Sequence, residues 1–214
     1  MQHLEQIAER IRLSFDARTN ARDRALSQTR TLTRLCANAI RAIHRDERLL
    51  AQQNLGEARQ LVESLRVNLA EYPDLYYAGY TQDALKEYAE ANIVFALVID
   101  ESLPTPEELD LEQATYLQGL AEAAGELRRR CMDILRHGHS HEAERLLSHM
   151  DDIYAVLVTM DYPDAITGGL RRLTDIVRGV TERTRGDMTT SLRQEQLQQS
   201  LQRLEARLEK LESV

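Results

Sequence analysis

The sequence predicts an all-α fold, a bundle of about seven helices with a C-terminal extension of coiled-coil type. Only four prolines and nine glycines occur among its 214 residues. Leu, Ala, Glu, Arg and Gln are abundant, and such a composition favours helices over strands. The length is enough for one domain with a sizeable hydrophobic core.

Helix breakers divide the chain into its expected helices. Pro73 and Pro163 interrupt the helical pattern, and Gly138 and Gly186 are expected to end helices. The run "ANIVFALVI" is apolar enough for a strand, but its helical flank "TQDALKEYAEA" favours a helix there. The expected helices cover residues 3–48 (as one or two), 50–71, 81–100, 107–136, 140–160 and 164–185.

The last segment of the chain has a different pattern, so we expect a helical domain over 1–187 and a helical tail over 188–214. Leucines recur in the tail at four-three spacing, which is typical of a coiled coil. The repeat spans about two heptads, too few for a stable isolated helix. We therefore expect the tail to pack on the domain or to pair between subunits. The leucines are Leu197, Leu201, Leu204, Leu208 and Leu211.

Composition also bears on where the protein acts. No apolar stretch is long enough to span a membrane, and the first residues lack the apolar segment of a signal peptide. Cys36 and Cys131 both fall in apolar helical patterns, so no disulfide framework is indicated. We expect a cytoplasmic protein with no membrane partner.

Charge is distributed unevenly, although the net charge is −8. Residues 1–48 hold ten arginines and six acids, a net +4, whereas residues 49–126 hold fifteen acids and three bases, a net −12. On a continuous helix, five arginines would share an arc of about 60° over roughly 27 Å. Such a stripe repels itself unless the protein's own acids or nucleic-acid phosphates neutralise it. Its members are Arg30, Arg34, Arg41, Arg45 and Arg48.

Paired carboxylates form the second candidate constellation. Glu87 and Glu90 lie one helical turn apart, just before the apolar run. Like charges at this spacing destabilise a helix, whereas a hard cation such as Mg²⁺ would bind both. Two further pairs, Glu122 with Glu126 and Asp151 with Asp152, are candidates for the same metal site. Chance spacing among 35 acids is the competing explanation.

Two other patterns carry less weight. Glu87 and Glu90 followed by Glu107 and Asp110 resemble the acidic motifs of all-helical nucleoside-triphosphate pyrophosphohydrolases, but the second pair lies beside two prolines. Acids at a helix start usually serve the helix dipole. The "HGHSH" segment, residues 137–141, is better explained as a solvated turn than as a metal site.

The chain resembles the translin/TRAX family from about residue 18 to residue 187. The stretches that carry the resemblance include "LKEYAEA" (85–91), "YLQGLAEAAGELRRRCMD" (116–133) and "LLSHMDDIY" (146–154). The resemblance implies an all-α bundle that assembles into hollow octamers around single-stranded nucleic acid. It also implies that TRAX-type subunits are Mg²⁺-dependent endoribonucleases, whereas translin subunits only bind.

By this resemblance the Glu-x-x-Glu motif of "LKEYAEA" makes the chain TRAX-like, as an archaeal- or bacterial-type homologue. Glu87 and Glu90 match the catalytic pair, and the third catalytic acid matches Asp152 or its neighbour Asp151. Glu126 matches a glutamate shared by both branches, and we include it among the candidate ligands for Mg²⁺ or Mn²⁺.

Three functions follow as hypotheses. The first is a metal-dependent endoribonuclease that cleaves single-stranded RNA inside a homo-oligomer, an octamer by the resemblance, with the arginines holding the backbone. The second is a translin-like protein that binds single-stranded RNA or DNA without cleaving it. The third is a helical interaction protein whose leucine tail mediates assembly.

Overall fold

The computed structural model describes residues 1–138 and 140–212. This part of the chain contains eight helices and no strand, which confirms the all-α prediction. No described helix has the length and apolar character needed to cross a membrane. The helices are α1 (Gln2–His44), α2 (Arg48–Asn68), α3 (Pro73–Tyr76), α4 (Gly79–Ile99), α5 (Gln113–Leu135), α6 (Ser140–Leu157), α7 (Asp164–Thr167) and α8 (Leu170–Glu212).

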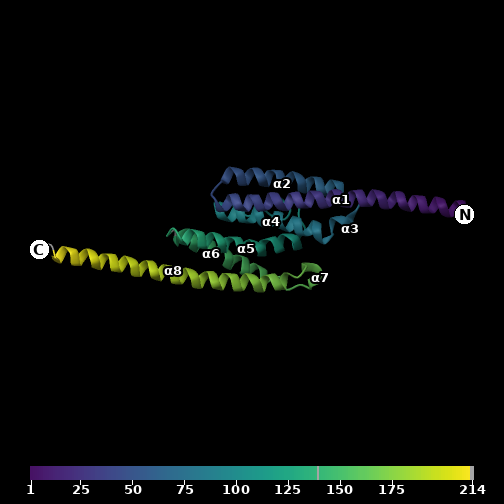
Figure 1. Cartoon of the computed structure of the whole chain (residues 1–214). Coiled ribbons are helices and arrows are strands. Elements are labelled where there is room, and N and C mark those ends of the chain that lie inside the picture. The colour runs from purple at the N-terminus through teal and green to yellow at the C-terminus, as the bar shows by residue number, and fades with distance from the viewer. Residues whose placement is uncertain (139, 213–214) are drawn as a thin grey trace. The chain divides into compact units, whose positions relative to one another are not determined.

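The chain forms two compact units that meet within α5, residues 1–120 and residues 121–214. In the first unit, α1 packs along both α2 and α4 (Figure 1). Its first turns continue past the ends of those two helices. In the second unit, α6 packs against the first half of α8. The predicted division after residue 187 lies inside α8 and stays a prediction.

The end of α1 is set by an aspartate where the usual residue is glycine. Asp46 has a left-handed backbone, with φ of 61°. Its N–H donates to the carbonyl oxygen of Ile43 at 3.1 Å, and that of Glu47 donates to Ala42 at 2.9 Å. These two bonds form a Schellman motif, which satisfies the last carbonyls of a helix. The chain therefore turns after His44 and does not continue as one helix to residue 48.

This turn breaks the predicted arginine stripe. Arg30, Arg34 and Arg41 lie on α1 within an arc of about 40°. Arg45 is the C-cap residue of α1, and Arg48 is the first residue of α2. The prediction that all five line one continuous helix is therefore wrong.

Helix α5 begins at Gln113 rather than at residue 107. A capping box does form upstream, because the N–H of Thr105 donates to Glu108 at 2.8 Å and the N–H of Glu108 donates to the Thr105 hydroxyl at 3.2 Å. It starts only a short turn. Asp110 then takes a left-handed backbone, with φ of 58°, and ends that turn before the helix begins.

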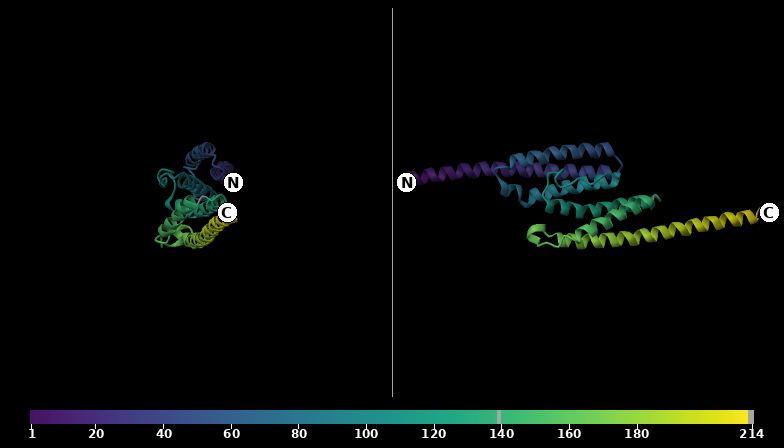
Figure 2. Two further views of the ribbon diagram at one scale, coloured as in Figure 1. Left: turned by 90° about the vertical axis from the view of Figure 1, so that its left-hand side faces the viewer. Right: turned by 180° about the vertical axis from the view of Figure 1, so that it is seen from behind.

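Helix α8 runs without interruption through Gly186, so the predicted helix end at this glycine is wrong. A helical glycine costs about 1 kcal/mol relative to alanine, which a 43-residue helix tolerates. The second half of α8 extends beyond α6 (Figure 2). Four of its leucines are 51–61% exposed, so they are not buried by the other helices of their unit: Leu197, Leu201, Leu204 and Leu208. The side chain of Leu211 lies outside the described ones.

Candidate functional site

Helix α4 holds the predicted carboxylate pair in place. Most of its length is buried against α1 and α2, including Leu85, Tyr88 and Ile93. Glu90 is only 8% exposed and Glu87 is half-buried. A carboxylate oxygen of Glu87 and one of Glu90 lie within 4.8 Å of each other. Burial of a carboxylate is unfavourable unless it is compensated, so chance placement on a solvated face does not explain this pair.

A buried thiol lies close to the two glutamates. Cys36 of α1 is fully buried, and its pKa is raised, mainly because burial disfavours the thiolate. The negative charges of Glu87 and Glu90 raise this pKa further. The thiol form of Cys36 is therefore favoured, and its side chain packs close to the pair.

Helix α5 touches the backbone of α4 at the level of the pair. A Cβ placed on Gly119 would lie 2.6 Å from the Cβ of Ala89, 2.8 Å from the Lys86 carbonyl oxygen and 2.9 Å from the Glu90 nitrogen. Each of these distances is shorter than a real side chain allows. The glycine is thus required for the two helices to approach so closely between Glu87 and Glu90.

Two further acids follow on α5, which continues without a break to Leu135. Glu122 is half-buried and comes one turn after Gly119 on the same side of that helix. Glu126 comes two turns after Gly119 and forms an ion pair with Arg129 at 3.6 Å.

The arginines that the sequence singled out are all exposed. Within residues 1–138 and 140–212, none of them forms an ion pair with an acid. Arg41 donates to the Asn38 side chain at 2.5 Å, and Arg48 donates to the Ile99 carbonyl oxygen at the end of α4, at 3.5 Å. We call Arg30, Arg34 and Arg41 the arginine row. Among the described residues no acid forms an ion pair with this row, although Asp83 and Glu87 line one cavity with Arg30.

A cavity of about 420 Å³ between α1 and α4 is lined by members of both the carboxylate pair and the arginine row. We call it the α1–α4 cavity. Arg30 of the row and Glu87 of the pair both line it, together with Asp83 and Tyr80. Sequence reasoning missed the last two. The available signal was the spacing of Asp83, four residues before Glu87, which puts both on one helix face.

Asp151 and Asp152 lie on α6 in the second unit. Asp151 is half-buried and bonds to Arg185 of α8 at 2.5 Å, whereas Asp152 is exposed. This ion pair lies within the second unit and accounts for the half-buried position of Asp151. Asp152 remains the better candidate for the third acid, and its role stays a prediction.

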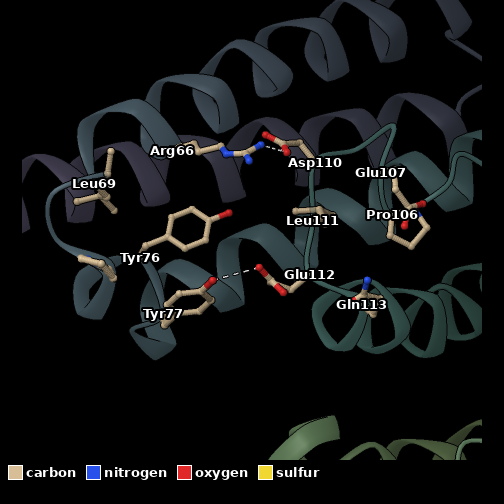
Figure 3. Close-up of a pocket in the computed structure, with 12 residues that line it drawn as sticks. Arg66, Leu69, Tyr76, Tyr77, Pro106, Glu107, Asp110, Leu111, Glu112 and Gln113 are labelled. Atoms are coloured by element: carbon tan, nitrogen blue, oxygen red, sulfur yellow. Dashed lines mark hydrogen bonds and ion pairs between the residues drawn. The ribbon is translucent and has the colours of Figure 1, made fainter.

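The rival acidic motif belongs to a different cavity, shown in Figure 3. There Asp110 forms an ion pair with Arg66, and the Tyr77 hydroxyl donates to Glu112 at 3.1 Å. Glu107 and Asp110 lie in a turn, so they are not one turn apart on a helix as the pyrophosphohydrolase pattern requires. In the "HGHSH" segment, His137 and His141 are exposed, and His139 lies outside the described residues.

Together the fold and the site define a class: an all-α protein with a partly buried carboxylate pair and an exposed row of arginines that form no ion pair within the described residues. No family model matches the chain. An uncharacterized protein of Methanocaldococcus jannaschii is 32% identical over 188 residues, which cover 87% of this chain and 83% of that protein.

Solved structures are also similar. The duplex RNA complex of AfC3PO, from Archaeoglobus, has 31% identity and a TM-score of 0.78, covering 88% of this chain and 96% of that one. A second AfC3PO structure has 32% identity and a TM-score of 0.79, with coverages of 86% and 96%. Apo-NeC3PO shares the fold at 20% identity, with a TM-score of 0.79 and the same coverages. The chain belongs to the translin/TRAX family.

Proposed function

We propose that the protein is a metal-dependent endoribonuclease that cleaves single-stranded RNA. The observation that carries the proposal is the pair itself: buried Glu90 and half-buried Glu87, with carboxylate oxygens within 4.8 Å, beside a cavity that Arg30 also lines. Carboxylates that are fixed by packing beside a cavity that an arginine also lines suit a reaction on a phosphodiester.

The donor atoms fit a hard divalent cation. Two oxygens bound to one Mg²⁺ at about 2.1 Å are at most about 4.2 Å apart, so a small side-chain adjustment would let Glu87 and Glu90 share an ion. Asp152 is the proposed third acid by family resemblance. We add Glu122 to the proposed ligands because it follows Gly119 by one turn of the same helix. Glu126, which pairs with Arg129, is the weaker candidate.

Bound Mg²⁺ or Mn²⁺ would supply an activated water and offset the charge that develops on the phosphate. The protein's own contribution is positional. Glu87 and Glu90 are fixed on a helix that is buried over most of its length, and the exposed arginine row offers guanidinium groups to the phosphates. Contacts to phosphates position a strand without reading its sequence.

The comparisons support nucleic-acid binding more directly than cleavage. AfC3PO, about one third identical to this chain over most of its length, is known in a complex with duplex RNA. A translin-like protein that binds single strands without cleaving them is therefore the second candidate function. The buried carboxylate pair favours the nuclease, because binding alone does not require two adjacent acids.

A cleavage assay separates these candidates. With a labelled single-stranded RNA we expect endonucleolytic products in Mg²⁺ or Mn²⁺ and none in EDTA, with activity restored when the metal is added back. Binding of the same RNA, followed by fluorescence anisotropy, should persist in EDTA. RNA that is bound but never cut in either metal would reject the nuclease in favour of the second candidate.

The arginine row predicts the salt dependence of binding. The variant Arg30→Gln/Arg34→Gln removes two phosphate contacts, so its slope of log affinity against log salt should be shallower by about 1.4. Arg59→Gln is the matched control, because Arg59 is exposed on α2 and pairs with Glu63 at 3.4 Å. An identical slope in the double variant and the wild type would remove the row from RNA binding.

Self-association is part of the same proposal, with an octamer as the expected number. The exposed, regularly spaced leucines of α8 support it, since about half of each of their surfaces stays open in the described chain. A second copy of this segment would present the same four-three pattern, which is the arrangement a coiled coil requires.

A further inference from the structure

The α1–α4 cavity is also lined by polar side chains that have no role in the function proposed above. Its volume of about 420 Å³ is within the range of small-ligand sites. Four polar side chains that neither constellation contains also line it. They are Thr29, Thr33, Tyr80 and Asp83.

Three charged side chains line this cavity, namely Arg30, Asp83 and Glu87. Arg30 and Asp83 are both exposed, and neither has an ion-pair partner among the described residues. An arginine and an aspartate attract each other at close range. Their separation leaves a donor on α1 and an acceptor on α4 available to one ligand.

Tyr80, which lines the cavity, has a polar group that is unsatisfied in the structure. The Tyr80 hydroxyl is buried and has no hydrogen-bond partner in the described part of the chain. A buried hydroxyl without a partner is unfavourable and uncommon in proteins. The hydroxyl has almost no accessible surface, so a polar ligand group in the cavity becomes its partner only when the ring turns outward.

Asp83 restricts what that ligand group can be. A carboxylate only accepts hydrogen bonds, and it repels the phosphates that Arg30 attracts. On an RNA strand the uncharged donors are the ribose 2′-hydroxyl and the base N–H groups. The sugar is the better match, because Asp83 lies about 6 Å along α4 from Glu87, close to where the proposed function holds the scissile phosphate. Carboxylates bind ribose hydroxyls in this way in dinucleotide sites.

We propose that the α1–α4 cavity binds one ribonucleotide of the substrate strand and that Asp83 accepts a hydrogen bond from its 2′-hydroxyl. Arg30 holds the phosphate of the same nucleotide, and the Tyr80 hydroxyl bonds to its sugar or base once the ring has turned outward. Asp83 is thus a specificity residue that makes the protein prefer RNA over DNA. The inference rests on the proposed function, since it needs the strand to pass Glu87.

The test compares affinities for three oligonucleotides of one sequence: RNA, DNA and 2′-O-methyl RNA, which keeps the oxygen but cannot donate. Binding is measured on the full-length protein in EDTA, so cleavage does not interfere. The wild type should bind RNA at least about tenfold more tightly than either analogue, the effect of one charge-assisted hydrogen bond. Asp83→Ala should remove most of this preference. Glu63→Ala, an exposed acid on α2 outside the cavity, should keep it.

Each other outcome has a distinct meaning. Equal loss of affinity for all three strands in Asp83→Ala would show that Asp83 does not act through the 2′-hydroxyl, which overturns the inference. Unchanged preference in that variant, or no preference in the wild type, would also overturn it and leave the nuclease proposal intact. A wild-type protein that binds none of the strands would instead reject the proposed function itself.

Discussion

Glu90→Gln should abolish RNA cleavage while RNA binding survives. The substitution keeps the shape of a side chain that is only 8% exposed but removes the negative charge that a divalent cation needs. We expect cleavage in Mg²⁺ to fall by at least about 10²-fold, the size of effect seen when one group that stabilises developing charge is lost. Single-turnover cleavage of labelled RNA, beside anisotropy measurements of binding, gives both quantities.

Glu87→Gln should act in the same direction, because its carboxylate lies beside that of Glu90. The matched control is Glu63→Gln, which makes the same change on an exposed site of α2. A thermal melt of each variant separates lost chemistry from lost folding. Folded Glu90→Gln protein that cleaves at the wild-type rate would remove this residue from the mechanism, whatever the other acids do.

The sequence predicted the parts of this site that lie on one helix. Glu87 and Glu90 sit three residues apart in a segment with a helical flank, so their shared face followed from helix geometry alone. Their burial could not be predicted in this way. It depends on α1 and α5 covering α4, and the close approach of α5 rests on Gly119.

Predictions failed where one backbone conformation decides the course of the chain. Asp46 and Asp110 take left-handed conformations that glycine adopts far more often, so neither was foreseen as a stop. The first error extended the arginine stripe to Arg48, and the second started α5 six residues too early. Gly186 caused the opposite error, because a glycine with helical geometry was taken for a helix end.

The α1–α4 cavity could not be predicted from the sequence for a different reason. Arg30 and Asp83 are 53 residues apart in the sequence, and only the register of α1 against α4 brings both into the lining of one cavity. A single sequence contains the period of each helix but not the alignment of two helices along their axes. A site formed by residues of two helices therefore cannot be predicted without the structure, whereas a pair within one helix can.

The packing at Gly119 leads to the second large expected effect. Gly119→Ala should destabilise the protein, although alanine is the better helix former by about 1 kcal/mol. The added methyl group would overlap the Lys86 carbonyl oxygen and the Glu90 nitrogen, which are backbone atoms and cannot rotate away. Overpacking of this kind costs about 1–3 kcal/mol.

Gly125 provides the matched control, because it lies on the same helix α5 with nothing within 4 Å of an added Cβ. Gly125→Ala should therefore raise stability by roughly 0.5–1 kcal/mol, as expected for an open helical site. For a chain of this size, 1 kcal/mol shifts Tm by about 2–4 °C, so the two variants should move Tm in opposite directions when measured at one protein concentration. If Gly119→Ala raises Tm as Gly125→Ala does, the contact between α4 and α5 is looser than the structure shows. The tight support inferred for Glu90 would then be lost, because the contacts that leave no space for a methyl group are the same ones that fix its helix.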